Sequence, residues 1–220
     1  MSEQFLEEGD SKVSREEQKR ERRNKIIAVA KKHFLLNGMQ NVQLQDIAKD
    51  AGVGIATLYR YFPNKDQLII AVNNNIMQEM TNTIDQIVNE SSTAFEQLDR
   101  LLTYYMDLAD EPAHQFVKFF KTFEIYKDEV LNDSENYQTF LHIRRNFADV
   151  LLQLVKNGQQ DGSLRNDLDL EVFVFTAVQN VSYFVSEAVL VEHDPTLTVD
   201  LNPKKQLQLL KDMFLQYVRP

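Results

Sequence analysis

The chain has 220 residues, and 43% of them are hydrophobic, which suits one or two globular domains. It contains no cysteine, so disulfides and thiolate metal sites are excluded, and we expect a cytoplasmic protein. Residues 12–65 hold 12 Lys and Arg against 5 Asp and Glu, whereas residues 66–220 hold 12 against 24, and the chain as a whole has a net charge of −9. A basic segment joined to an acidic body is typical of a protein that contacts nucleic acid at one end only.

The chain starts with a polar, acidic segment, residues 1–13, which lacks the pattern of a signal peptide and which we expect to be a flexible tail. Ser14 and Glu17 have the spacing of a capping box and predict a helix that ends near Asn37 and Gly38. The first half of this helix is rich in Lys and Arg. Those cations could attract DNA phosphates or form a solvated face with the glutamates between them, and the sequence leaves both interpretations open.

The next segment predicts two short helices joined by a glycine turn. Leu44, Ile47 and Ala51 lie at helical spacing before the turn at 52–54, and a second short helix follows. Two short helices around such a turn predict a helix-turn-helix, whose second helix enters the DNA major groove. Leu58 and Phe62, four residues apart, would face the first of these two helices, which leaves the opposite face of the second helix free for DNA.

The amino-acid sequence of this segment resembles that of the TetR family of bacterial transcriptional regulators. The matching residues are Ile47-Ala48, Ala51-Gly52-Val53, Thr57-Leu58-Tyr59, Tyr61-Phe62, Lys65 and Leu68. The chain departs from the family pattern at Gly54, where a serine is usual, and at Ala56, where a glycine is usual. The first departure removes a hydroxyl that could bind phosphate. The second adds a methyl group that could meet a thymine methyl, as could Ile55.

The resemblance implies a set of DNA-contacting residues. Backbone contacts would come from Thr57, Tyr59, Tyr61 and Lys65, with the start of the first motif helix, Gln43 or Leu44, near a phosphate. Gln45, Ile55, Ala56 and Arg60 would face bases. Gly54 would be the N-cap of the second helix, whose free N–H groups suit a phosphate.

The rest of the chain is predicted to be helical, without strands or repeats. A long helix over 64–89 would link the domains. Further helices are expected from Ser91 or Ser92, from Pro112, over 134–157, over 169–192 and over 204–218. The predicted fold is therefore all-α, with a three-helix DNA-binding domain at 14–63 and a larger helical effector-binding and dimerisation domain at 64–220.

The stretch 172–191 is long enough to span a bilayer, but Gln179, Asn180 and Glu187 would be costly in lipid. A helix that is apolar nearly all round is instead expected in a core or an interface. We predict a two-fold homodimer built from the last two helices. The expected interface residues are Phe173, Ala177, Val181, Phe184, Leu207, Leu210 and Phe214.

Aromatic side chains gather in the middle of the second domain. They could form a solid core, or they could line an effector pocket between helices. The candidate pocket residues are Tyr104, Tyr105, Phe116, Phe119, Phe120, Phe123, Tyr126 and Phe147. Since few basic residues lie near them, we expect a hydrophobic or aromatic effector, neutral or cationic, rather than a polyanion.

We find no catalytic or cofactor motif. The four histidines are scattered, and the glycines at 52 and 54 lack the rest of a dinucleotide fingerprint. The sequence thus predicts a non-enzymatic transcriptional regulator that needs no metal or cofactor, most simply a ligand-released repressor on a palindromic operator. The alternatives are an effector-independent regulator or activator, and a helical protein-interaction module that does not bind an operator.

Overall fold

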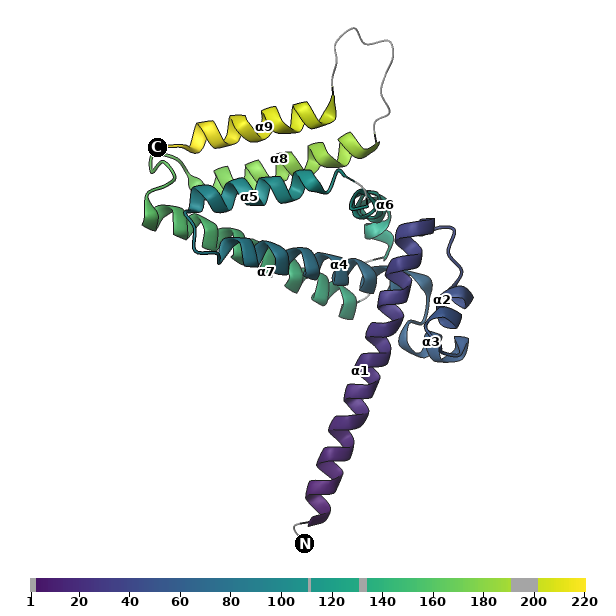
Figure 1. The fold of residues 1–220 in the computed structure, drawn as a ribbon. Helices are drawn as coiled ribbons and strands as arrows, with labels where there is room; N and C mark the ends of the chain where they lie inside the picture. Colours follow the sequence, from purple (N-terminus) through teal and green to yellow (C-terminus); the bar gives the residue numbers. More distant parts are fainter. Residues whose placement is uncertain (1–2, 111, 131–133, 191–201) are drawn as a thin grey trace, which may run out of the picture. The chain divides into compact units, whose positions relative to one another are not determined.

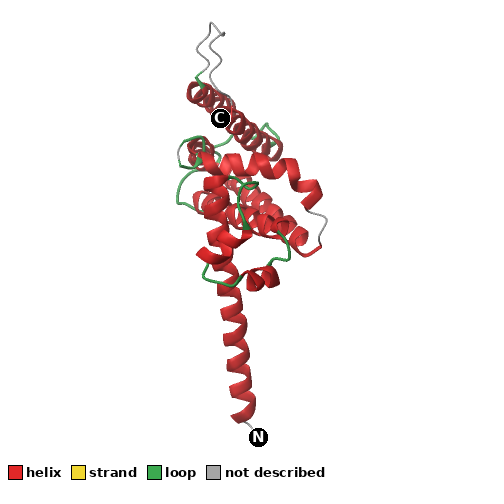
Figure 2. Ribbon diagram, turned by 90° about the vertical axis from the view of Figure 1, so that its right-hand side faces the viewer, coloured by secondary structure: helices red, strands yellow, loops and turns green. Residues whose placement is uncertain are grey.

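The computed structural model describes residues 3–110, 112–130, 134–190 and 202–220; side chains are described from Ser14 onward, apart from some near 125–136 and 189–190. Every regular element in these ranges is an α-helix (Figures 1 and 2). The chain divides into two compact units, 1–75 and 76–220. Helix α4 (Lys65–Val88) contributes to both, so its first turns belong to the N-terminal unit.

The N-terminal unit packs α1 (Glu3–Asn37), α2 (Leu44–Asp50) and α3 (Ile55–Tyr61) around one small core. Helix α1 supplies its second half, where Ile26, Ala30 and Phe34 recur at helical spacing and are 2% exposed or less. Ile47 of α2 and Leu58 of α3 are fully buried, as the spacing predicted.

The first helix begins earlier than the sequence indicated. It starts at Glu3 rather than Ser14, so the prediction of a helix start at the capping-box pattern was wrong. Residues 3–13 contain no proline, and their one glycine costs about 1 kcal/mol without ending a helix. The side chains of residues 1–13 lie outside the described part of the structure.

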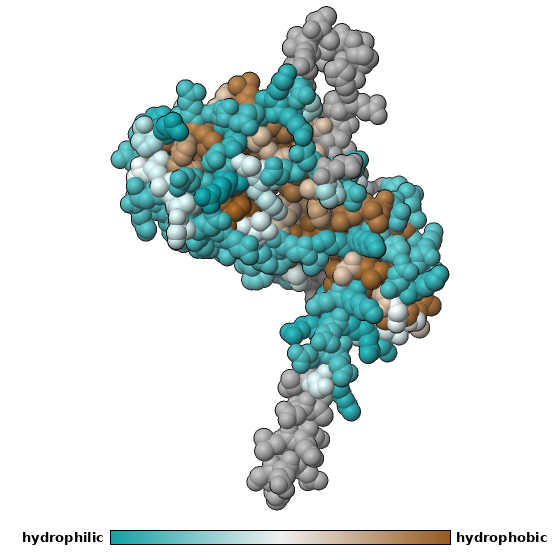
Figure 3. All heavy atoms as spheres, viewed as in Figure 1, coloured by the Kyte–Doolittle hydropathy of each residue, from teal (hydrophilic) through white to brown (hydrophobic). Residues whose placement is uncertain are grey.

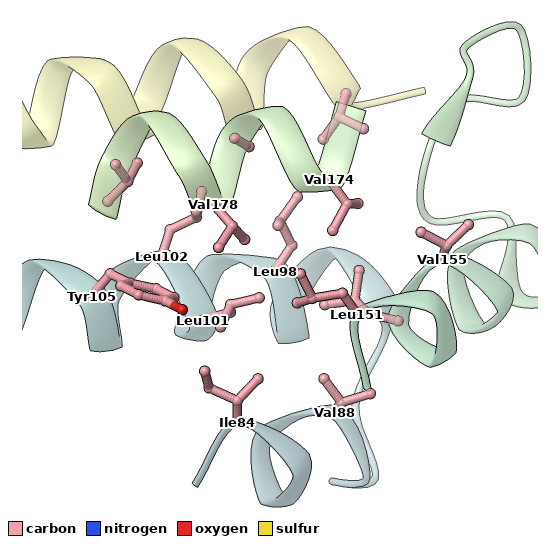
Figure 4. Packing of buried hydrophobic residues seen from close by; sticks show 14 of the residues in the cluster. Ile84, Val88, Leu98, Leu101, Leu102, Tyr105, Leu151, Val155, Val174 and Val178 are labelled. Carbon is pink, nitrogen blue, oxygen red and sulfur yellow. The ribbon is translucent and has the colours of Figure 1, made fainter. Parts of the chain in front are cut away.

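The second unit is a bundle in which α5 (Ala94–Asp107) packs against α7 (Ser134–Asp161), α8 (Leu170–Leu190) and α9 (Pro203–Val218). Helix α6 (His114–Val130) packs on α8. Figure 4 shows Leu98, Leu101 and Leu102 of α5 between Val174 and Val178 of α8 and Ile84 of α4. None of these α5 leucines is exposed to solvent, so α5 is the central helix of this core.

Three predicted helix bounds in this unit need correction. Helix α6 begins at His114 rather than at Pro112, which lies in the turn before it. Helix α5 begins at Ala94, not after Ser91 or Ser92, because Thr93 and Glu96 make a complete capping box. Helix α7 continues through Gly158 to Asp161, beyond the predicted end at Asn157. A Cβ atom at Gly158 would lie 2.5 Å from the Leu164 side chain, so this glycine allows close packing inside the helix rather than ending it.

Polar contacts fix the beginning of α5 to the loop after α7. The N–H of Ala94 donates to the Asp161 carboxylate at 2.7 Å, and the N–H of Phe95 donates to the Ser163 hydroxyl at 3.0 Å. Asn157 donates to the Val88 carbonyl at 3.2 Å and to the side chain of buried Gln97 at 2.9 Å. The first N–H groups of α5 and the last turn of α4 are thus satisfied by α7 and its loop.

No helix in the described residues is long and apolar enough to cross a membrane. Helix α8, whose sequence raised that question, has Ala177 and Val181 fully buried and Gln179 and Asn180 exposed. Its buried apolar residues therefore serve the bundle core, as the polar residues in the stretch indicated.

Candidate DNA-binding surface

The turn between α2 and α3 has a defined geometry. Gly52 has a φ of +68°, its N–H donates to the Lys49 carbonyl at 3.0 Å, and the N–H of Val53 donates to the Ala48 carbonyl at 2.9 Å. This pair of bonds is the Schellman motif, which uses a left-handed residue to end a helix. The glycine at this position therefore sets the angle at which the chain leaves α2.

Helix α3 begins at the predicted residue. Gly54 is the N-cap, with extended backbone, and its carbonyl accepts from the N–H of Thr57 at 2.8 Å and of Leu58 at 3.1 Å. No side chain caps this helix. A Cβ atom at Gly54 would find no other atom within 4 Å, so the surface beside the first turn is open.

The two faces of α3 differ as the i, i+4 spacing predicted. Leu58 and Phe62 are buried, at 0% and 2% exposure, and α3 packs on α2. Ala56, Tyr59 and Arg60 on the other face are exposed. An exposed aromatic side chain beside a basic one is suited to contact a nucleic acid.

Most of the residues expected to contact DNA are accessible in the folded unit. Gln43, Gln45, Gly54, Ala56, Tyr59 and Arg60 are exposed, and Ile55, Thr57, Tyr61 and Lys65 are partly exposed. These ten residues lie on α2 and its N-cap, on α3 and its N-cap, and at the first position of α4. Their contacts with DNA remain a prediction.

Leu44 is the exception among the expected contacts. Its side chain is 8% exposed and belongs to the core, so only its backbone N–H, at the first turn of α2, is left for a phosphate. The N-cap of α2 is Gln43, which makes no side-chain capping bond. Helical spacing could have identified Leu44 as buried, because it lies three and four residues before Ile47 and Ala48.

Lys65 has a structural contact that the sequence did not reveal. Its Nζ donates to the Gln40 carbonyl at 3.2 Å, across the loop between α1 and α2. Burial lowers the pKa of Lys65, and the neighbouring Asp66 carboxylate opposes that shift. An ammonium group has three donors, so the bond to Gln40 leaves others for a phosphate.

Two side-chain contacts hold α1 against the helix-turn-helix. His33 Nε2 lies 2.8 Å from the Asp50 carboxylate at the end of α2, and the Arg23 guanidinium stacks 5.2 Å from the centre of the Phe62 ring. Neither contact was predicted, because the sequence does not show which side chains of α1 meet a helix seventeen or more residues later. Both fix the helix that carries the basic stretch.

The basic stretch of α1 is hydrophilic surface (Figure 3). Lys19 lies 3.9 Å from Glu16, and Arg20 lies 3.8 Å from Glu17, with all four side chains more than half exposed. Exposed pairs of this kind contribute little to stability and exchange readily with other partners. The attraction of this stretch to phosphates remains a prediction beside the solvated-face interpretation.

The aromatic residues of the second unit are divided between core and partly exposed positions. Tyr105, Phe119 and Phe123 are buried, at 7%, 4% and 2% exposure. Tyr104, Phe116, Phe120 and Phe147 are partly exposed, and the side chain of Tyr126 lies outside the described residues. The Tyr104 and Tyr105 rings meet edge-on at 5.8 Å, as do Phe119 and Phe120 at 6.1 Å. Burial raises the pKa of Tyr105, so its hydroxyl stays neutral.

A shallow depression in the described residues lies elsewhere, at the end of α7. It measures about 600 Å³ and is lined by Gly158, Gly162, Leu164, Arg165 and Arg219, among others. Arg165 is already engaged there, by Asp167 at 2.6 Å and by the Tyr217 carbonyl at 3.2 Å. This depression joins the α7–α8 loop to the end of α9, away from the aromatic residues named above.

Three of the seven expected dimer residues belong to the core of the unit instead. Ala177, Val181 and Leu207 are 1% exposed or less, so they cannot contact a partner subunit, and their assignment to the interface is corrected. Phe173, Phe184, Leu210 and Phe214 are partly buried at the edge of that core. The apolar pattern of these two helices did not show which side of each faces inward.

The exposed apolar side of these helices carries other residues. On α9 they are Leu209, Met213 and Tyr217, at 61%, 59% and 56% exposure, spaced four residues apart. On α8 they are Val172 and Tyr183, at 62% and 67%. The i, i+4 spacing on α9 was present in the sequence and could have identified this stripe.

Residues 26–72 match the family model described as "Bacterial regulatory proteins, tetR family". Among curated relatives, the transcriptional repressor KstR2 of Rhodococcus jostii is 24% identical over 193 residues, which cover 87% of this chain and 90% of the repressor. The match of the family model covers α2, α3 and the buried half of α1, which are the elements of the candidate surface.

Solved structures share the fold over nearly the whole chain. A transcriptional regulator from Saccharomonospora viridis in complex with choline superposes with a TM-score of 0.69 at 16% identity, covering 91% of this chain and 98% of its own. The regulator FadR of Bacillus subtilis in complex with stearoyl-CoA superposes with a TM-score of 0.60 at 22% identity, covering 89% and 98%. These similarities confirm the all-α fold predicted from the sequence.

Proposed function

Since this chain belongs to the TetR family of bacterial regulators and is a DNA-binding transcriptional regulator, we propose that it acts as a homodimeric repressor which leaves a palindromic operator when a small molecule binds. The observation that carries the proposal is the exposed face of α3. Ala56, Tyr59 and Arg60 lie outward on a helix whose inward residue, Leu58, is fully buried. The acidic body would be repelled by DNA, so only this basic end of the chain would dock.

Selection of bound sequences from a random DNA pool tests the operator half of the proposal. A two-fold symmetric site is expected, with half-sites about 34–36 Å apart or at a multiple of the helical repeat. Binding should weaken steeply with salt, because phosphate contacts release counterions. Recovery of an asymmetric site, or of no preferred sequence, would contradict the proposal and favour a protein-interaction module.

The exposed apolar stripe supports the dimer. Leu209, Met213 and Tyr217 of α9 and Tyr183 of α8 expose large apolar side chains on two helices that pack together. A second copy of the same surface, placed by a two-fold axis, would cover these side chains in a self-complementary interface. The partly buried Phe173 and Phe214, with ring centres 6.0 Å apart, would lie at its edge.

For the effector, we propose a hydrophobic or aromatic compound held among the partly exposed aromatics of α5, α6 and α7. Tyr104 of α5, Phe116 and Phe120 of α6 and Phe147 of α7 are partly exposed, and few basic residues lie beside them in the sequence. The fold itself does not decide the charge of the effector, because one protein of the same fold holds choline and another holds stearoyl-CoA. An acyl chain would suit the apolar walls, and a cation would suit the rings.

A thermal-shift screen followed by operator-release assays tests this part. Compounds that release DNA must bind the released state more tightly, typically by about 1–3 kcal/mol of coupling. Helix α4, which contributes to both units, would carry the change to the helix-turn-helix. Release by phosphorylated or polycarboxylate metabolites alone would contradict the effector class, and release by no compound would favour an effector-independent regulator.

A further inference from the structure

We propose that the first turn of α3 reads DNA through methyl groups, so that each operator half-site places thymines opposite Ile55 and Ala56. The proposal rests on the operator binding proposed above and adds the chemistry by which bases are recognised. It concerns the first two positions of α3, where the side chains are apolar and cannot recognise a base by hydrogen bonds.

The apolar character of this turn comes from its side chains and their exposure. Ala56 is exposed and Ile55 is partly exposed, at the first two positions of α3. Apart from its two chain neighbours, no residue has an atom within 4 Å of the Cβ position of the preceding Gly54, so a base pair could approach this turn closely. None of the three side chains can donate or accept a hydrogen bond. In the major groove only thymine offers a methyl group, which apolar side chains recognise.

The polar side chains nearby point to A·T pairs as well. Guanine is usually read by a bidentate arginine or lysine, but the one basic residue of α3 is Arg60, in its last turn. The Arg60 guanidinium lies over the Tyr61 ring, 5.9 Å from its centre. Gln45 on α2 is exposed and has the amide that pairs with adenine. A guanine opposite Ile55 and Ala56 would therefore find no hydrogen-bonding side chain at those two positions.

Single-base replacement in a selected operator tests the inference. Uracil lacks the thymine methyl but keeps every hydrogen-bonding group, so each thymine is replaced by uracil in turn. We expect a loss of about fourfold in affinity at one or two positions of each half-site, the effect of burying one methyl-sized group, and no change elsewhere.

Cytosine replacement provides the converse test. At the same positions, changing T·A to C·G should weaken binding. An operator with 5-methylcytosine there should bind about fourfold more tightly than one with cytosine, because its methyl occupies the same place in the groove. Equal binding of cytosine and 5-methylcytosine at those positions would overturn the proposal, because the readout would then depend on hydrogen bonds.

Substitutions in the protein show which residue recognises the thymine methyl. Ile55→Ala should bring the thymine-to-uracil ratio close to one at its own position, with circular dichroism confirming that the variant stays folded. Gln45→Ala is the matched comparison, because it should lower affinity but leave that ratio unchanged. Selective binding without any uracil-sensitive position would overturn this inference alone, whereas loss of all selective DNA binding would overturn the proposed function with it.

Discussion

Tyr59 is the largest exposed apolar side chain of α3, at 43% exposure, and it has a hydroxyl that could reach a phosphate. We expect Tyr59→Ala to weaken binding to every DNA sequence by a similar factor, because a backbone contact has no base preference. The Tyr59→Phe variant removes only the hydroxyl, so it separates the contribution of the hydroxyl to DNA affinity from that of the ring. Gel-shift titrations on several operator variants measure both, and a change in base preference would contradict the assignment.

Lys65 combines a structural bond to the Gln40 carbonyl with an expected phosphate contact. Lys65→Met keeps most of the side-chain stem but removes the charge, so we expect weaker binding and a shallower salt dependence, by about one in the log–log slope per subunit. Thermal unfolding of the variant reports the loss of the Gln40 bond separately. An unchanged salt slope would mean that Lys65 serves only the fold.

Asp161 links the stability of the second unit to pH. Burial of its carboxylate favours the neutral form, but hydrogen bonds from the Ala94 N–H and from the Ser163 N–H and hydroxyl outweigh burial and lower the pKa of Asp161. A lowered folded-state pKa contributes stability above the unfolded value of about 4, and that stability is lost as the pH falls through the folded value.

Asp161→Asn tests that linkage without changing shape. We expect the variant to unfold at lower urea concentration than the wild type at pH 7. The two midpoints should converge only as the pH falls below about 4 and through the lowered pKa of Asp161, where the folded carboxylate becomes protonated. Urea titrations at several pH values measure the difference. A gap that stays constant with pH would show that the carboxylate charge contributes nothing.

Among the helices, α3 begins without a side-chain hydrogen bond at its N-cap, so its stability can be increased there. Gly54 caps the helix without a side-chain bond, its φ of −67° suits any residue, and the space beside it is open. Gly54→Ser should therefore add a hydroxyl that accepts from the first-turn N–H groups and stabilise the N-terminal unit by a few tenths of a kcal/mol. Gly54→Ala is the matched control and should not exceed wild-type stability. Thermal unfolding ranks the stability of the wild type and the two variants. A serine variant less stable than the wild type would contradict the open space described beside Gly54.

At the scale of the whole molecule, assembly depends on the outer side of α9. Leu209→Glu with Met213→Glu would place two charges in the expected two-fold interface, and we expect a monomer by sedimentation at micromolar concentration. Such a monomer should also bind the operator far more weakly, because one half-site is lost. Leu36→Glu, which changes an equally exposed leucine of α1, is the control and should remain dimeric. A wild-type monomer would exclude the dimer itself.

The sequence by itself determined the helix-turn-helix, because its signals are local. The turn glycines, the i, i+4 pairs and the Asn64 cap of α4 all act between residues a few positions apart. The same is true of the all-α class and of the order of the helices. The basic N-terminal segment was equally readable, since charge depends only on composition.

Tertiary structure decided what depends on distant partners. It joined Lys65 to Gln40 and His33 to Asp50. It also buried Ala177, Val181 and Leu207, so that the outward stripe of α8 and α9 consists of other residues. The exposed Gln179 and Asn180 mark an outward side of α8, but only the helices packed against it determine which apolar residues, such as Val172 and Tyr183, are left for a partner.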